Sequence, residues 1–69
     1  MTKGKKLSRV LIEKRMEKNL SIAEAAKEIG ISYLSLWKIE DGYSQLSYET
    51  VKKIANFLGI SVKEVRDIL

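Results

Sequence analysis

The spacing of serine and glycine residues most restricts how this chain folds, because it divides the sequence into short segments. Ser21 and Glu24 form the Ser-x-x-Glu pattern of a helix capping box, in which each side chain caps the other residue's backbone N–H group. Gly30 follows at the position where a helix of about two turns would end. Ser61 and Glu64 repeat the capping pattern near the end of the chain. These boundaries predict short helices joined by short turns.

Apolar residues between these boundaries recur every three or four positions, which is the period of an amphipathic helix. No segment alternates with a sustained period of two, so the fold class is predicted to be all-α. We expect five helices, at residues 7–18, 22–29, 33–41, 48–58 and from residue 62 onward. Their buried faces are expected to include Leu7, Val10, Leu11, Leu20, Ala25, Ala26, Ile29, Leu36, Ile39, Val51, Ile54, Ala55, Leu58, Val62, Val65 and either Ile68 or Leu69.

The connection between the second and third expected helices consists of Gly30, Ile31 and Ser32. A glycine adopts the positive φ of a tight turn at little cost, and a serine is a favoured N-cap for the following helix. A connection this short predicts that the two helices pack in helix-turn-helix geometry.

Length and composition exclude several classes of protein. A chain of 69 residues is expected to form one domain with a small core. It has neither Cys nor His, so disulfides, thiolate metal sites and the commonest general acid–base side chain are excluded. An enzyme, a metal site and a cofactor are therefore not expected. No apolar run is long enough for a secretion signal or a membrane span, which predicts a cytoplasmic protein.

Basic residues are concentrated at the N-terminal end of the chain. Residues 1–19 carry seven Lys or Arg and two Glu, a net charge of +5, so residues 20–69 carry −1 of the total of +4. We expect residues 1–6, with Lys3, Lys5 and Lys6, to form a flexible basic arm, and residues 7–69 to form the domain. Such an arm suits a polyanionic partner, although short Lys-rich termini are also common as solvated tails.

The segment from Ser21 to Gly42, S-I-A-E-A-A-K-E-I-G-I-S-Y-L-S-L-W-K-I-E-D-G, resembles the helix-turn-helix of the lambda-repressor-like DNA-binding proteins, the Cro, phage repressor and Xre type. The family's small helix residue falls on Ala26 and its turn glycine on Gly30. The resemblance extends over about residues 11–65. It implies a DNA-binding transcriptional regulator, acting as a repressor, that inserts its third helix into the major groove as a homodimer on a palindromic site.

The resemblance also assigns roles to individual residues. It implies a structural ion pair between Arg15, in the first helix, and Glu40, at the end of the third. The base-contacting positions of the family are filled here by Tyr33, Leu34, Trp37 and Lys38. Lys5 and Lys6 of the basic arm are expected to contact the DNA backbone. The other residues expected to contact it are Ser21, Ile22, Ser32, Ser35, Tyr43, Ser44 and Gln45.

Three of the expected base-reading side chains are large and apolar, whereas the family usually has hydrogen-bonding side chains there. One interpretation is that Tyr33, Leu34 and Trp37 contact thymine methyl groups. A second is that they bind protein, as in an antitoxin or an antagonist of another regulator, because Tyr and Trp dominate many protein interfaces. A third is that Trp37 folds back onto a neighbouring loop. The sequence leaves all three open.

A homodimer needs a self-complementary surface, for which the C-terminal part of the chain offers candidates. These candidates are Leu46, Val65, Ile68 and Leu69, each of which could equally belong to the core.

Overall fold

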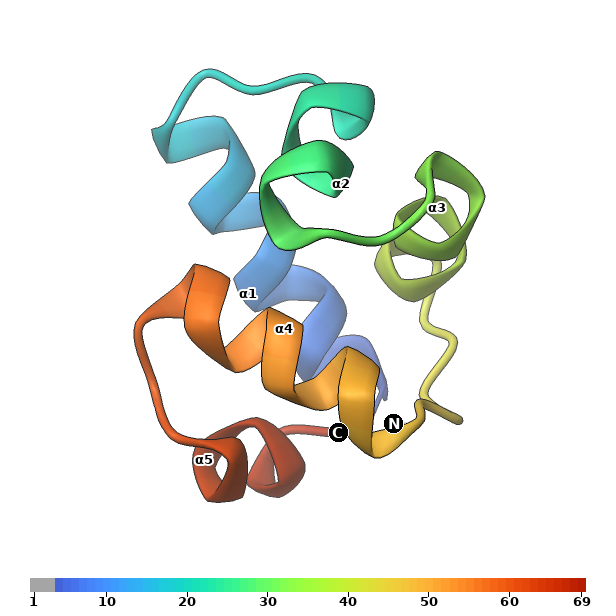
Figure 1. The fold of residues 1–69 in the computed structure, drawn as a ribbon, viewed down its shortest axis with the longest axis vertical. Coiled ribbons are helices and arrows are strands. Elements are labelled where there is room, and N and C mark those ends of the chain that lie inside the picture. Colours follow the sequence, from blue (N-terminus) through green and yellow to red (C-terminus); the bar gives the residue numbers. More distant parts are fainter. Residues whose placement is uncertain (1–3) are drawn as a thin grey trace.

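The computed structural model describes residues 4–69 and has five α-helices and no strand in that range (Figure 1). The helices are α1 (Gly4–Glu17), α2 (Ile22–Ile29), α3 (Tyr33–Glu40), α4 (Tyr48–Leu58) and α5 (Val62–Asp67). The all-α prediction is confirmed. None of these helices is both long and apolar enough to cross a lipid bilayer.

Both predicted capping boxes are present. The Ser21 hydroxyl accepts a hydrogen bond from the Glu24 N–H at 3.1 Å, and the Glu24 carboxylate accepts one from the Ser21 N–H at 2.8 Å. Ser61 and Glu64 make the same two bonds at the start of α5. The bond from the Ser21 backbone N–H lowers the pKa of Glu24, because it favours the charged carboxylate. The sequence therefore located the start of each of these helices.

Helix α1 begins earlier than predicted. It starts at Gly4, so Lys5 and Lys6 belong to its first turn and not to a separate arm; Lys3 lies outside the described residues. Lysine is a good helix former, and Leu7 is fully buried, so the first turn extends a helix that the core already holds in place. The arm predicted over residues 1–6 is therefore too long, because residues 4–6 belong to α1.

The core is formed by one apolar cluster to which every helix contributes. Its buried members are Leu7, Leu11, Ala25, Ala26, Ile29, Leu36, Ile39, Val51, Ile54, Ala55 and Val65. Val10, expected in the buried stripe of α1, is only half-buried. Val65 was a candidate for the dimer surface, and that expectation is wrong: its side chain has no exposed area, because α5 turns it into the core.

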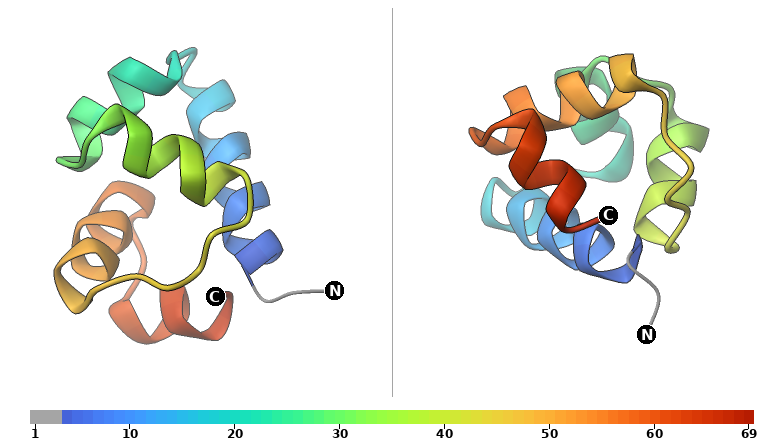
Figure 2. Two further views of the ribbon diagram at one scale, coloured as in Figure 1. Left: turned by 90° about the vertical axis from the view of Figure 1, so that its right-hand side faces the viewer. Right: turned by 90° about the horizontal axis from the view of Figure 1, so that it is seen from below.

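The arrangement of the helices leaves one side of α3 uncovered. Helix α3 packs against α1 and α2, while α4 packs against α2 and α5 (Figure 1). When the molecule is turned by 90°, α3 lies in front of the other helices with its long side toward the viewer (Figure 2, left). A helix held on its inner side and open on its outer side is suited to enter a groove of a partner.

Candidate nucleic-acid interface

The turn between α2 and α3 fixes the angle between the two helices. Gly30 has a φ of 95°, and its N–H donates to the Ala26 carbonyl at 2.8 Å. The N–H of Ile31 donates to the same carbonyl at 3.0 Å. From α4, the Lys53 ammonium donates to the Gly30 carbonyl at 3.1 Å. The turn is thus held by its own backbone and by a side chain from another helix.

The first residues of α3 are set by an exposed serine cap. The Ser32 hydroxyl accepts from the Ser35 N–H at 3.1 Å and bonds the Ser35 hydroxyl at 2.8 Å. Such a cap satisfies one of the free N–H groups that begin a helix. It leaves the start of α3 open to solvent, where a phosphate could approach the remaining N–H groups.

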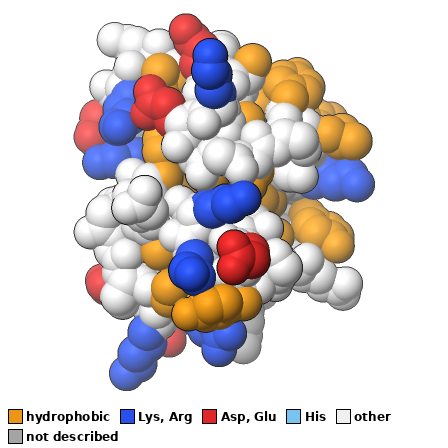
Figure 3. All heavy atoms as spheres, in the orientation of Figure 1, with side chains coloured by type: hydrophobic (Ala, Val, Ile, Leu, Met, Phe, Trp, Pro, Cys, Tyr) orange, Lys and Arg blue, Asp and Glu red, His pale blue; other side chains and the backbone are white. Residues whose placement is uncertain are grey.

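The outer face of α3 carries the four residues expected to read bases. Leu36 and Ile39 point into the core with 1% of their surface exposed, whereas Tyr33, Leu34 and Trp37 are 55%, 57% and 48% exposed. Lys38 is also exposed. The space-filling view shows hydrophobic side chains gathered at the right-hand side, over α3 (Figure 3). Trp37 is therefore not folded into satellite core, which removes the third interpretation of this surface.

An ion pair attaches the C-terminal end of α3 to α1. Arg15 donates through Nε to Glu40 Oε2 at 2.9 Å and through Nη2 to Oε1 at 3.1 Å. Its Nη1 donates to the Leu20 carbonyl at 3.0 Å, and the Ser8 hydroxyl donates to the Glu40 carbonyl. The Arg15 and Glu40 side chains are only 19% and 8% exposed. The bidentate hydrogen bonding between Arg15 and Glu40 limits rotation of α3 and so orients its outer face.

A small polar hollow of about 210 Å³ lies between α3 and the start of α4. It brings Lys38 together with Tyr43 and Gln45, two of the predicted backbone contacts. Ser35, another predicted backbone contact, also lines it. Ser47 and Thr50 complete the polar lining, and their hydroxyls lie 3.0 Å apart. Thr50 was missed by sequence reasoning, although its place three residues after the cap Ser47 marks the first turn of α4.

The other predicted backbone contacts are more widely spread. Ser21 is exposed at the start of α2, and Ser44 is half-buried in the loop before α4. Ile22 packs its side chain against the core, so only its backbone remains for a phosphate. Lys6 lies on α1 beside Ile68, in a different groove of the molecule. The structure thus groups Tyr43 and Gln45 with Lys38 of α3 and separates Lys6 from them.

Comparison with known proteins assigns the chain to a family. The Helix-turn-helix family profile matches residues 11–65, which includes α2, α3 and the turn between them. The chain therefore belongs to the Xre/Cro-like helix-turn-helix family. The predicted resemblance is confirmed. This family consists of DNA-binding transcriptional regulators and is not a class of enzymes.

Two relatives of this helix-turn-helix protein carry names that bear on regulation. An HTH-type transcriptional regulatory protein of Sulfolobus acidocaldarius is 36% identical over 55 residues, covering 80% of this chain but 18% of that protein. The ImmF control region 10 kDa protein of Bacillus phage phi105 is 35% identical over 66 residues, covering 96% of this chain and 73% of that protein. No solved structure matches the chain significantly.

Proposed function

We propose that this protein is a sequence-specific transcriptional regulator, acting as a repressor, that inserts α3 into the major groove of duplex DNA. The observation that carries the proposal is the exposed outer face of α3, held in a fixed orientation by the Gly30 turn and the Arg15–Glu40 pair. The major groove admits one α-helix and displays a different pattern for each base pair. A rigid helix with one open face meets that requirement.

The side chains of α3 favour A·T-rich sites in this proposal. Leu34 and Trp37 offer apolar surface for thymine methyl groups, and the Tyr33 hydroxyl and the Trp37 indole N–H can donate to phosphates. Lys38 lies beside the polar hollow and can pair with a phosphate or a guanine edge.

Phosphate anchoring falls to the loop and helix starts around α3. Tyr43, Gln45 and Thr50 present hydroxyl and amide groups next to Lys38, and Ser21 and Ser32 mark two helix N-termini with unpaired N–H groups. Polar neutral groups position a duplex without releasing many counterions. We therefore expect modest affinity for non-specific DNA.

A homodimer on a palindromic site follows from the size of α3. One recognition helix reads only a few base pairs, and a two-fold pair of helices doubles the site. Leu46, Ile68 and Leu69 are half-buried and remain candidates for part of the dimer surface.

Selection of bound sequences from a random pool of DNA duplexes tests this function. We expect an enriched A·T-rich palindrome, with half-sites about one helical turn apart. If no sequence is enriched, and the outer face of α3 binds a protein instead, the protein-binding alternative replaces the proposal.

Trp37, the single tryptophan of the chain, gives a direct test of the reading surface. At 48% exposure its fluorescence in the free protein should be red-shifted and quenched by acrylamide, and the selected duplex should protect it. Trp37→Ala should leave the unfolding free energy nearly unchanged, because no core cavity forms, yet lose about 1–3 kcal/mol of discrimination between cognate and mutated sites.

Met16→Ala is the matched control for Trp37→Ala, because Met16 is 64% exposed on α1. It should bind the selected duplex like the unaltered protein. A Trp37→Ala variant that discriminates between sites as well as this control would show that Trp37 does not contact base edges.

The N-terminal lysines should contribute to the salt dependence of DNA binding. We expect the triple variant Lys3→Ala, Lys5→Ala, Lys6→Ala to flatten the plot of log K against log[salt], by up to about 0.9 for each phosphate that is no longer neutralised. Substitution is preferable to deletion, because α1 begins at Gly4. The slope is measured by fluorescence anisotropy over a range of salt concentrations. An unchanged slope would show that these lysines are solvated and do not contact phosphates.

A further inference from the structure

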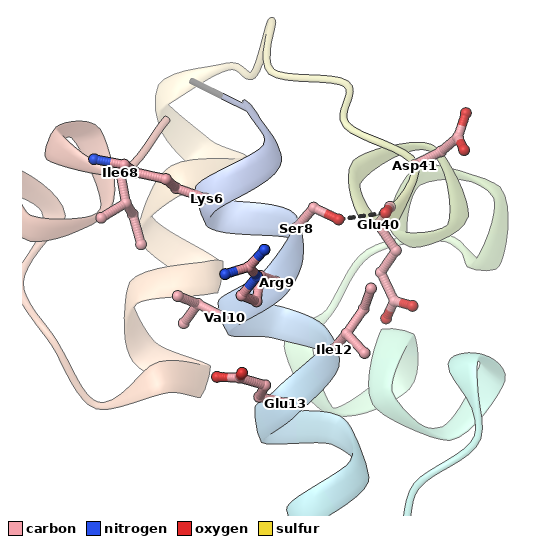
Figure 4. A pocket seen from close by; sticks show the side chains of 9 residues that line it. All are labelled: Lys6, Ser8, Arg9, Val10, Ile12, Glu13, Glu40, Asp41 and Ile68. Carbon is pink, nitrogen blue, oxygen red and sulfur yellow. Dashed lines mark hydrogen bonds between the residues drawn. The ribbon is translucent and has the colours of Figure 1, made fainter. Parts of the chain in front are cut away.

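A second and larger groove, of about 800 Å³, lies over α1 (Figure 4). Its lining comes from α1, from Ile68 after α5, and from the C-terminal end of α3 at Glu40 and Asp41. None of Tyr33, Leu34 or Trp37 lines it. An occupant of this groove would therefore leave the base-reading side chains of α3 uncovered.

One face of α1 dominates the groove. Lys6, Arg9, Val10 and Glu13 all line it, and their spacing of three, four and seven residues places them on one side of the helix. Figure 4 shows Val10 at the middle of this face, with Arg9 and Glu13 beside it and Ile68 near Lys6. This explains why Val10, which was expected in the core, is half-buried: it lies at the edge between the core and the groove.

The charges on this face are separated along the helix and form no ion pair within the residues that the structure describes. Lys6 and Arg9 are on the N-terminal side of Val10, and Glu13 is on its C-terminal side. In the part of the chain that the structure describes, the ion pairs of α1 use Lys14, Arg15 and Glu17 instead. Arg9 and Glu13 are exposed and are left available to a partner.

We propose that this face of α1 pairs with the same face of a second copy of the chain. The two α1 helices cross antiparallel at Val10, so that Arg9 of each copy meets the partner's Glu13. A two-fold interface requires a patch that is complementary to itself, and a helix face that is basic at one end, apolar in the middle and acidic at the other has that property when reversed. Ile68 adds apolar surface beside the crossing point.

This inference specifies the surface of the proposed homodimer and rests on the proposed function only for the role of that dimer on DNA. The patch is small, so we expect a dissociation constant in the micromolar range or weaker for the free protein. The exposed charges should make it sensitive to salt.

Cysteine cross-linking tests the crossing point, because the chain has no cysteine of its own. Val10→Cys would place one thiol from each copy close to the two-fold axis, within reach of the short Cα separation that a disulfide requires. Under mild oxidation this variant should form covalent dimers at least about tenfold faster than Met16→Cys, whose residue is more exposed on the same helix. Equal rates for the two variants would overturn the proposed crossing point.

Charge reversal tests the pairing of Arg9 with the partner's Glu13. Arg9→Glu and Glu13→Arg should each weaken dimerisation in sedimentation equilibrium by about tenfold or more, because each places like charges opposite one another. The double variant Arg9→Glu, Glu13→Arg should recover it, since the pairs re-form with reversed signs. Lys27→Glu, an equal change of charge at an exposed residue of α2, should have little effect. Thermal melting checks that every variant folds.

The outcomes separate this inference from the proposed function. Single reversals that leave dimerisation unchanged, or a double variant that stays as weak as the singles, would overturn the α1 interface. A protein that selects a palindrome but dimerises through another surface keeps its function and loses this interface. A protein that dimerises through α1 and selects no duplex keeps the interface and loses the proposed function.

Discussion

Replacement of Arg15 by methionine should remove about 3 kcal/mol or more of the free energy of unfolding, a large share of what a domain of this size has. The Glu40 carboxylate is 8% exposed and would lose both of its guanidinium hydrogen bonds at 2.9 and 3.1 Å. The Leu20 carbonyl would lose its Arg15 donor as well. A charge left unpaired in a buried position costs far more than the pair itself contributes.

Urea denaturation of three variants separates these effects. The double variant Arg15→Met, Glu40→Met should be clearly more stable than Arg15→Met alone, because it leaves no buried charge without a partner. Lys18→Met removes another ion pair, with Glu28 at 3.4 Å, whose side chains are 42% and 46% exposed; it should cost less than about 1 kcal/mol. If Arg15→Met costs no more than Lys18→Met, the Arg15–Glu40 pair does not fix α3.

Gly30→Val should destabilise the domain by about 2–3 kcal/mol, because it forces a β-branched residue into a φ of 95°. The Cβ itself adds no clash, since a Cβ at this position would meet the Lys53 side chain at an ordinary contact distance of 3.7 Å. The cost should therefore follow backbone preference and not side-chain volume. Gly30→Asn should be the mildest change, because asparagine tolerates the left-handed conformation.

Thermal melting of the Gly30 variants should rank Asn above Ala and Ala above Val. Lys38→Ala is the control, because it removes an exposed side chain of α3 and should leave the melting temperature nearly unchanged. A Lys38→Ala variant that melts as early as Gly30→Val would contradict the assigned orientation of α3.

The helix boundaries were largely determined by local sequence. The starts at Ser21, Ser32, Ser47 and Ser61 are short-range capping patterns, and each side chain accepts the expected backbone N–H. The turn at Gly30 is equally local, since only the φ preference of that residue is needed. Such features could be predicted because they depend on residues within four positions of one another.

The outer face of α3 could also be predicted from the sequence. Leu36 and Ile39, three residues apart, define the buried side, which leaves Tyr33, Leu34 and Trp37 outside. Whether Trp37 folds back onto a loop could not be decided, because that depends on which element passes over it. The structure leaves Trp37 48% exposed, so it is not buried beneath a loop.

Only the tertiary structure decided how the faces of α1 and α5 are used. Val65 in α5 and Ile68 directly after that helix are only three residues apart, yet Val65 is fully buried and Ile68 lines the α1 groove. Val10 belongs to the apolar stripe by period but lies at the edge of the core. Periodicity gives the direction of a side chain around its own helix. How far burial extends around that helix depends on where its neighbours pack, and that packing joins residues distant in the chain.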